Sequence, residues 1–287
     1  MHMAVPHLQT IAPTTRSLME RALEPHILLG MPHLTPFGLS ETWLMKELGH
    51  RHWLMLAIRL GMDDADFRTP GGSEAYASIC ASSLEHVGGG LPIARPNDIL
   101  EIRSSLSFLA RNQHSSLHRL RIRDRPICEV ELVSTFVARQ TESDNHTLAR
   151  VEKPVPLVRQ LGTSGLAGEA SAMRKAAAVR RNFGDVGKSE VFEVCFSPCP
   201  SEDFNGAGLL YFANLQRFVA QAISQSSLGQ KRFKRQEVFF FGNIRAGEAI
   251  SVRLYAPSGN DALVADIVRG DGKTIVIARF LSAAANS

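Results

Sequence analysis

The sequence predicts an α+β fold in which antiparallel sheets wrap around two long helices. In each half of the 287-residue chain, a strand and a polar loop are followed by one long apolar helix. Three or four strands with alternating apolar and polar residues then complete each half. Because this order of elements occurs twice, at a period of about 130 residues, it indicates an internal repeat.

The first repeat follows an N-terminal arm and begins with a short strand, HILLGM (26–31). The loop MPHLTPFGLSE then leads into an apolar run that predicts a helix near residues 39–60. Extended segments at 74–87, 98–122 and 126–140 alternate apolar and polar residues, as half-buried antiparallel strands do. The turn-forming stretches ARPND and RDRP separate them.

The second repeat has the same plan, with a strand at 191–199 and a helix predicted at 208–226. Strands RQEVFFFGNI, GEAISVRLYA, DALVADIVRG and TIVIARFLSA follow, and DGK predicts a hairpin between the last two. We expect repeats at 1–140 and 188–287 with a linker at 141–187. One helix wrapped by one antiparallel sheet is the hot-dog arrangement. The predicted fold is therefore a double hot dog, whose two sheets are able to join edge to edge and so remove exposed strand edges.

The composition is that of a water-soluble domain, with 44% hydrophobic and 21% charged residues. We expect no membrane span, no signal peptide and a cytoplasmic protein with reduced cysteines. Cys195 and Cys199 lack the partners of a metal site, and no motif indicates nucleic-acid binding. The basic clusters at 174–181 and 231–235 are either solvated surfaces or contacts for phosphates or an acidic protein.

The loop before each predicted helix is a candidate site for an acyl thioester. A helix N-terminus leaves amide groups unpaired, and such amides stabilise the negative charge that develops on a thioester oxygen. The candidate binding residues are Gly38, Leu39 and Ser40 in the first loop, with Asn205 and Gly206 in the second. The alternative is that the glycines serve as turn residues and Ser40 as a helix cap.

Tyr76 and His33 are the candidate catalytic residues. Tyr76 opens the strand after the first helix, where a phenol is able to donate a proton or a hydrogen bond to an enolate or a carboxylate. His33 is the histidine near the first loop site, with a structural hydrogen bond as its alternative role. Glu41 and Asp203 are further carboxylates near the loops, although both positions also suit caps and turns.

Two stretches carry a resemblance to a known family. MPHLTPFGLSETWLMKELGHRHW with EAYASICAS, and FSPCPSEDFNGAGLLYFANLQRF in the second repeat, resemble the leinamycin-type acyltransferase/decarboxylase family of polyketide biosynthesis. The resemblance implies a double hot-dog enzyme that acts on malonyl- or methylmalonyl-coenzyme A. It implies decarboxylation and transfer of the acyl group to an acyl carrier protein, with Tyr76 as the catalytic tyrosine and no metal or redox cofactor.

Other functions remain open. The chain has no GHSxG nucleophile motif and no dehydratase-type pair of His and Asp/Glu in its usual frame. A hot-dog thioesterase or dehydratase would use Asp203 or Glu41. A module that binds acyl thioesters or a carrier protein without catalysis is the third possibility. We expect acyl-coenzyme A and an acyl carrier protein as partners, and a homodimer is a further possibility.

Overall fold

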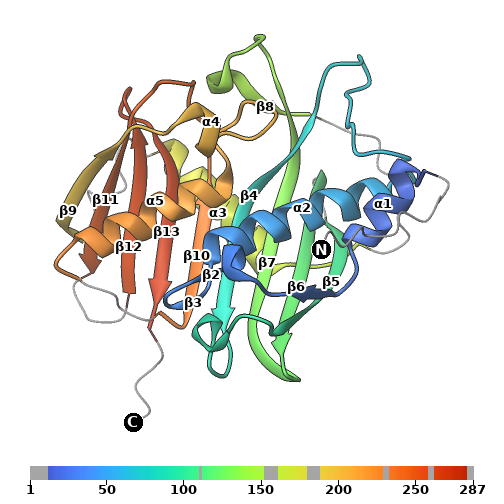
Figure 1. The fold of residues 1–287 in the computed structure, drawn as a ribbon. Coiled ribbons are helices and arrows are strands. Elements are labelled where there is room, and N and C mark those ends of the chain that lie inside the picture. Colours follow the sequence, from blue (N-terminus) through green and yellow to red (C-terminus); the bar gives the residue numbers. More distant parts are fainter. Residues whose placement is uncertain are drawn as a thin grey trace, which may run out of the picture.

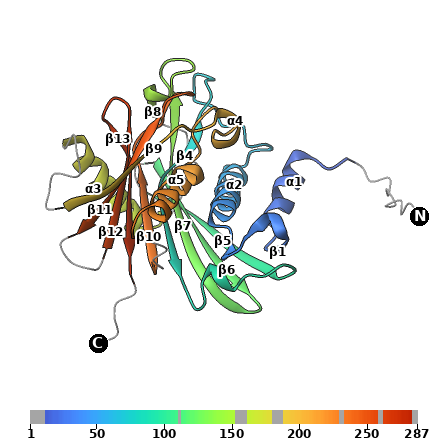
Figure 2. The same cartoon turned by 60° about the vertical axis from the view of Figure 1, so that its left-hand side comes forward.

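A computed structural model describes residues 12–109, 112–151, 161–179, 188–228, 233–257 and 262–282 of the chain. In these residues eleven strands form one antiparallel sheet. The sheet carries two long helices on one face and a third on the other (Figures 1 and 2). No helix in these ranges is long and apolar enough to cross a membrane.

The first half of the chain forms one side of the sheet. Its elements are α1 (Thr15–Ala22), β1 (His26–Leu28), η1 (Met31–His33), β2 (Leu34–Thr35), β3 (Gly38–Leu39), α2 (Glu41–Arg59), β4 (Tyr76–His86), η2 (Leu91–Ile93), β5 (Ile99–Leu109), β6 (Gln113–Ile122), β7 (Arg125–Arg139), η4 (Asn145–Thr147) and β8 (Leu148–Arg150).

The second half of the chain forms the other side of the sheet. After α3 (Gly165–Val179), its elements are β9 (Lys188–Phe196), α4 (Pro200–Asp203), α5 (Phe212–Gln225), β10 (Arg235–Phe240), β11 (Ile250–Pro257), β12 (Ala262–Arg269) and β13 (Thr274–Leu281).

The two halves have the same topology. Along the sheet the first half reads β1-β5-β6-β7-β4, and the second, taken from the opposite edge, reads β9-β11-β12-β13-β10. The halves join where β4 pairs with its counterpart β10, with Ser82 opposite Val238. Because equivalent strands pair antiparallel, a pseudo-twofold axis relates the halves. The predicted double hot dog is confirmed, with its two sheets joined into one.

Helix α2 packs its apolar side on the sheet. Ser40 caps its N-terminus by accepting a hydrogen bond from the Trp43 amide (3.2 Å). Leu44 and Leu48, one turn apart, are fully buried in the main core. Gly49 weakens the helix intrinsically, but α5 crosses there. A Cβ on this residue would lie 2.6 Å from the Tyr211 hydroxyl oxygen.

The structure differs from the expected elements in two places. The segment predicted as one strand over 98–122 is two strands, β5 and β6, which pair antiparallel, and Asn112 directly before β6 has a φ of 57°. Both long helices also begin later than predicted. Residues 38–39 pair with residues 34–35 before α2 starts, and Phe204 bridges to Leu210 before α5 starts.

The segment between the repeats contains a strand that pairs with the first half and a helix that packs on the sheet. Strand β8 extends the first sheet by pairing with β7. Helix α3 lies on the outer face, away from α2 and α5 (Figure 2). There Leu166 and Ala170 pack against Phe239 of β10. The linker expected at 141–187 therefore contributes structure to the sheet and its outer layer.

A chain of polar side chains lies buried between α2 and the first half of the sheet. The His52 ring contacts the hydroxyl oxygens of Ser116 (2.6 Å) and Ser134 (2.7 Å). Ser116 also contacts Nε2 of His118 (2.8 Å), whose Nδ1 lies 2.8 Å from Ser104 Oγ. Every ring nitrogen of these two histidines is therefore satisfied.

Burial lowers the pKa of both histidines to about 3. The positive charge of Arg51 adds to this effect for His118, and neighbouring histidines add to it for His52. Both rings are therefore neutral at pH 7.

This network predicts that the fold is sensitive to acid. A histidine in the unfolded chain has a pKa of about 6.5. Between pH 6.5 and 3 the unfolded state therefore binds more protons, and stability that is complete above pH 6.5 is lost as the pH falls. We expect each histidine to cost on the order of 3 kcal/mol of unfolding free energy at pH 4. Urea unfolding between pH 7 and pH 4 measures the loss.

The same titration on His118→Gln identifies the source. The variant is expected to be less stable at pH 7 and to show a shallower dependence on pH, because one buried titrating group is gone. An unchanged slope would contradict this account of the network.

Candidate functional site

A pocket of about 540 Å³ lies where the two halves meet. Its walls come from α2, from the segment that enters β4, from the loop at 204–211 and from the end of β10 with the residues after it. Its lining residues include Gly49, Tyr76, Asn205, Tyr211 and Asn243. The pocket thus contains groups from both repeats.

The Tyr76 hydroxyl lies between the carboxylate of Glu74 and the guanidinium of Arg139. Its hydroxyl donates a hydrogen bond to Glu74 Oε2 (2.5 Å) and accepts one from Arg139 Nη1 (2.7 Å). The Arg139 guanidinium carbon also lies 5.3 Å from the centre of the tyrosine ring. Burial raises the pKa of Tyr76, and the bond to Glu74 raises it further, while Arg139 opposes both. The phenol is therefore protonated at neutral pH, with an acceptor for its proton and a cation beside its oxygen.

Arg139 is fixed by the second half of the chain. Its Nε donates to Asn145 Oδ1 (2.9 Å), and its Nη2 donates to the Ala207 carbonyl. Asn145 is buried, and its amide donates to the carbonyls of Gly208 (2.7 Å) and Ile244 (2.8 Å). The position of Arg139 beside Tyr76 therefore depends on contacts across the junction of the halves.

Asn205 organises the second loop. Its Oδ1 accepts from the amides of Ala207 (3.1 Å) and Leu209 (3.0 Å). These two bonds fix the orientation of the side chain, since only the oxygen is able to accept them. Within the described ranges no group accepts from Asn205 Nδ2 or from the Gly206 amide. Both donors belong to residues that line the pocket.

The remaining amides of this loop are used within the fold. Gly208 donates to the Asn205 carbonyl (2.8 Å), Leu210 donates to Asn243 Oδ1 (3.0 Å), and Tyr211 donates to the Asp203 carbonyl (3.0 Å). Of the four amides at 206–209, that of Gly206 is the one without an acceptor in the described part of the chain.

The first loop does not line this pocket. Gly38 has a φ of 112°, and a Cβ there would lie 2.4 Å from the Leu91 carbonyl oxygen, so it packs against backbone. Leu39 is buried, and Ser40 caps α2. His33 accepts a hydrogen bond from the Gly30 amide at Nδ1 (2.8 Å). Of the predicted site residues, the structure brings together Tyr76, Asn205 and Gly206, and it places His33, Gly38, Leu39 and Ser40 elsewhere.

The two alternative carboxylates have partners away from the pocket wall. Glu41 accepts a hydrogen bond from Gln236, and burial raises its pKa. Asp203 is buried, accepts from the Cys199 amide (2.8 Å) and pairs with Arg217 (2.6 Å). Asp203 therefore binds the backbone at the start of α4 and connects α4 to Arg217 of α5.

Several residues in the pocket wall or beside it were not anticipated from the sequence. Glu74 precedes Tyr76 by two positions and Arg139 ends β7, so their convergence requires the β4–β7 pairing. His50 of α2 lines the pocket and is exposed. Tyr211 contributes a second phenol. The signal for Glu74 was its spacing from Tyr76 in a strand, which places both on one face.

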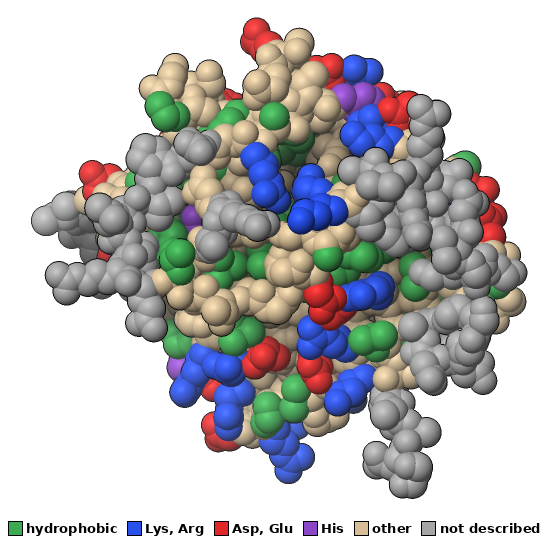
Figure 3. Space-filling model, turned by 180° about the vertical axis from the view of Figure 1, so that it is seen from behind, with side chains coloured by type: hydrophobic (Ala, Val, Ile, Leu, Met, Phe, Trp, Pro, Cys, Tyr) green, Lys and Arg blue, Asp and Glu red, His purple; other side chains and the backbone are tan. Residues whose placement is uncertain are grey.

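The predicted basic clusters are only partly described. In 174–181 the side chains beyond Lys175 lie outside the described residues, as do residues 231–232 of the second cluster. Lys234 and Arg235 pair with Glu85 (3.5 and 3.2 Å). Figure 3 shows basic and acidic side chains intermixed over the lower part of the outer face. The described members of the second cluster are therefore neutralised locally.

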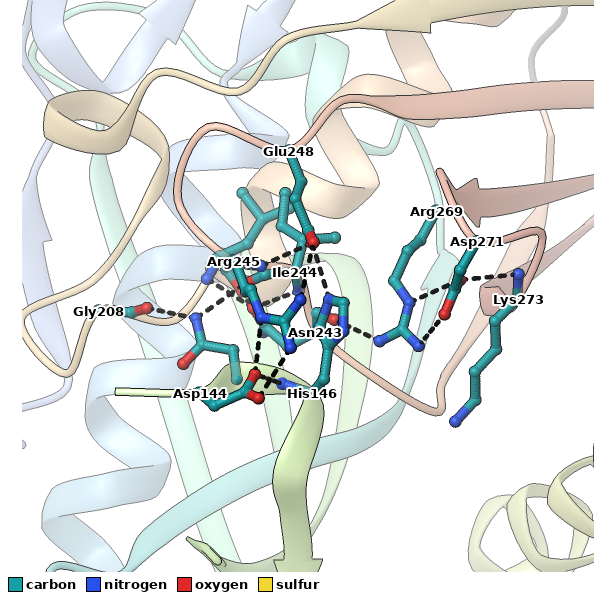
Figure 4. A network of polar contacts seen from close by, with 12 residues as sticks. Asp144, His146, Gly208, Asn243, Ile244, Arg245, Glu248, Arg269, Asp271 and Lys273 are labelled. Carbon is teal, nitrogen blue, oxygen red and sulfur yellow. Dashed lines mark hydrogen bonds and ion pairs between the residues drawn. The ribbon is translucent and has the colours of Figure 1, made fainter. Parts of the chain in front are cut away.

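A polar network supports the pocket loop from outside (Figure 4). Arg245 forms a bidentate ion pair with Asp144 (2.9 and 2.8 Å), and His146 contacts Glu248 (2.8 Å). Arg245 holds the pKa of Asp144 down at about 2. These contacts hold the η4 segment, and with it Asn145, against the second half.

No metal site is apparent in the described ranges, where no group of three or more His, Cys, Asp and Glu side chains is arranged to hold an ion.

Comparison with known proteins gives structural neighbours. No model of a known protein family matches the chain, and no curated protein matches it either. The 12:0-ACP thioesterase from Umbellularia californica superimposes with a TM-score of 0.62 at 9% identity, covering 89% of this chain and 95% of that one.

An acyl-ACP thioesterase from Bacteroides thetaiotaomicron superimposes with a TM-score of 0.58 at 10% identity, covering 92% of this chain and 98% of that one. At these identities the likeness concerns the fold, and it supports the hot-dog architecture. Membership of the leinamycin-type family remains a prediction.

The junction predicts that Asn145 is a major contributor to stability. Asn145→Ala leaves the Gly208 and Ile244 carbonyls without their donor, and Arg139 without its Asn145 acceptor. We expect a loss of about 2–3 kcal/mol in unfolding free energy, measured by urea unfolding. Glu142→Ala, an exposed change on the same connection, is expected to alter stability by less than about 0.5 kcal/mol. Equal effects of the two substitutions would contradict the proposed role of Asn145.

Proposed function

We propose that this protein is an acyl-thioester enzyme in which Tyr76 attacks a thioester bound in the pocket between the two halves. The observation that carries the proposal is the placement of the Tyr76 hydroxyl between Glu74 and Arg139. A carboxylate is able to take the phenolic proton while a guanidinium stabilises the oxygen that loses it. An adjacent general base is one way in which a nucleophilic hydroxyl is activated.

The proposed reaction has two steps. The Tyr76 oxygen attacks the thioester carbonyl as its proton passes to Glu74. The carbon–sulfur bond then breaks, and the leaving thiolate takes that proton, which leaves the acyl group as an ester on Tyr76. Water or the thiol of an acyl carrier protein then accepts the acyl group, and the phenol is restored. The first acceptor gives hydrolysis and the second gives acyl transfer.

Asn205 and Gly206 would stabilise the intermediate. The Asn205 Nδ2 group and the Gly206 amide belong to residues of the pocket wall and have no acceptor in the described ranges. A carbonyl oxygen that gains negative charge needs such donors, and each is typically worth about 3–4 kcal/mol in the transition state. This assignment keeps the oxyanion role expected of the second loop but moves it to two specific donors.

Hydrolysis or acyl transfer fits the pocket better than decarboxylation. The charge of Glu74 beside Tyr76 opposes a substrate carboxylate at the same position. Arg139 favours decarboxylation instead. Its guanidinium contacts the Tyr76 hydroxyl, and its positive charge would attract the substrate carboxylate if the Glu74 side chain turned away. Decarboxylation of a malonyl-type thioester therefore remains a second candidate, which carbon dioxide release would reveal.

The structural neighbours support the proposed substrate class. Two proteins with this architecture are named acyl-ACP thioesterases, and we propose that the partner here is likewise an acyl-coenzyme A or an acyl carrier protein. Both repeats of one chain form the pocket, so the proposed site needs no second chain. A homodimer remains a prediction.

Tyr76→Phe tests the function. The substitution removes the nucleophilic oxygen and keeps the ring, so turnover of acyl-coenzyme A thioesters is expected to fall about a hundredfold or more. The melting temperature should change little. Release of free thiol, free acid and carbon dioxide is measured in parallel on the wild type and the variant.

Tyr255→Phe is the matched control, because Tyr255 lies buried against Val264 and Ile277, away from the pocket. It should retain wild-type turnover. A folded Tyr76→Phe variant with full activity would remove Tyr76 from the mechanism.

A further inference from the structure

Tyr211 is a second phenol in the pocket, and the proposed reaction does not use it. It stands at the N-cap position of α5 and makes no side-chain capping bond. Its hydroxyl lies against Gly49 of α2, and both residues line the pocket. The absence of a side chain at Gly49 leaves the space that this hydroxyl occupies.

The Tyr211 hydroxyl has no hydrogen-bond partner within the described ranges. The tyrosine is half-buried, and the centre of its ring lies 4.9 Å from that of Phe212. A hydroxyl group that a bound ligand shields from water needs a new hydrogen-bond partner, since leaving it without a bond is costly. Because this hydroxyl adjoins a pocket, a ligand atom is the natural partner.

The chemistry of the hydroxyl specifies that atom. Burial raises the pKa of Tyr211 to about 12, and the charge of Glu47 adds to the effect. The phenol is therefore a hydrogen-bond donor at neutral pH, and its ligand partner is an acceptor. Glu47 is near Tyr211, and Glu74 lines the same pocket. A neutral acceptor therefore fits better than a carboxylate.

The proposed reaction already supplies donors for the thioester carbonyl, namely Asn205 and Gly206. Tyr211 belongs instead to the wall formed where α2 and α5 cross, on the side of Gly49. We propose that the acyl chain of the substrate carries a neutral oxygen, a hydroxyl or a ketone, that accepts a hydrogen bond from Tyr211. This inference rests on the proposed function, because it assumes that the pocket holds an acyl thioester.

Such a contact would make Tyr211 a determinant of specificity. A site built to bond a substrate oxygen rejects the analogue that lacks it, because the buried donor is then left unpaired. An apolar pocket would show the opposite preference, since it would favour the chain without the hydroxyl. The two cases therefore differ in the sign of the preference.

The test compares chains of equal length. Dissociation constants are measured for uncleavable ketone analogues of hexanoyl-, 3-hydroxyhexanoyl- and 5-hydroxyhexanoyl-coenzyme A, in which a methylene group separates sulfur from the carbonyl. The full-length wild type should bind one of the hydroxylated analogues about tenfold or more tightly than the hexanoyl analogue. Tyr211→Phe should bring that ratio close to one, and Tyr255→Phe should leave it unchanged.

The outcomes separate this inference from the proposed function. Turnover of the corresponding thioesters without any preference for an oxygen would overturn the inference and leave the proposed function intact. A preference that persists in Tyr211→Phe would overturn it too, as would selective binding of a malonyl analogue. Oxygen-dependent binding that Tyr211→Phe abolishes, without turnover, would support the inference and contradict the catalytic proposal. If the variant does not fold, the sign of the wild-type preference decides.

Discussion

The pairing of β4 with β10 is the contact on which the pocket depends. These strands are equivalent in the two repeats, and their antiparallel hydrogen bonds turn two sheets into one. The same junction brings the first residues of β4, which carry Tyr76, to the loop that carries Asn205. Neither half contains the pocket alone. Without the pairing, Tyr76 would lose the part of the pocket wall that the second half supplies.

The two repeats have diverged around their shared plan. In the first, the loop before the helix is a small hairpin packed on the backbone of Leu91, and Glu41 is bonded to Gln236. In the second, the equivalent loop is held by Asn205 and borders the pocket. The first loop is thus filled by packing, whereas the second leaves Asn205 Nδ2 and the Gly206 amide without an acceptor in the described ranges.

Periodicity and order of elements were sufficient to predict the repeat, the two long helices and the hot-dog architecture, because apolar alternation records which face of each strand is buried. The break between β5 and β6 was missed because no Gly or Pro marks it. The site was harder to predict. Tyr76 and Asn205 lie in stretches that the sequence singles out, whereas strand pairing brings Arg139 to Tyr76 and helix crossing brings Tyr211 to the pocket. Contacts between residues so far apart in sequence leave no local pattern.

A crystal structure with the uncleavable ketone analogue of hexanoyl-coenzyme A tests most directly whether the pocket between the halves is the acyl-thioester site. The analogue should occupy that pocket, with its carbonyl carbon in contact with the Tyr76 hydroxyl and its carbonyl oxygen within hydrogen-bond distance of Asn205 Nδ2. An analogue bound elsewhere would contradict the account. The polar cleft that contains Arg103, Arg121 and Arg123 at the opposite end of the sheet is one such place.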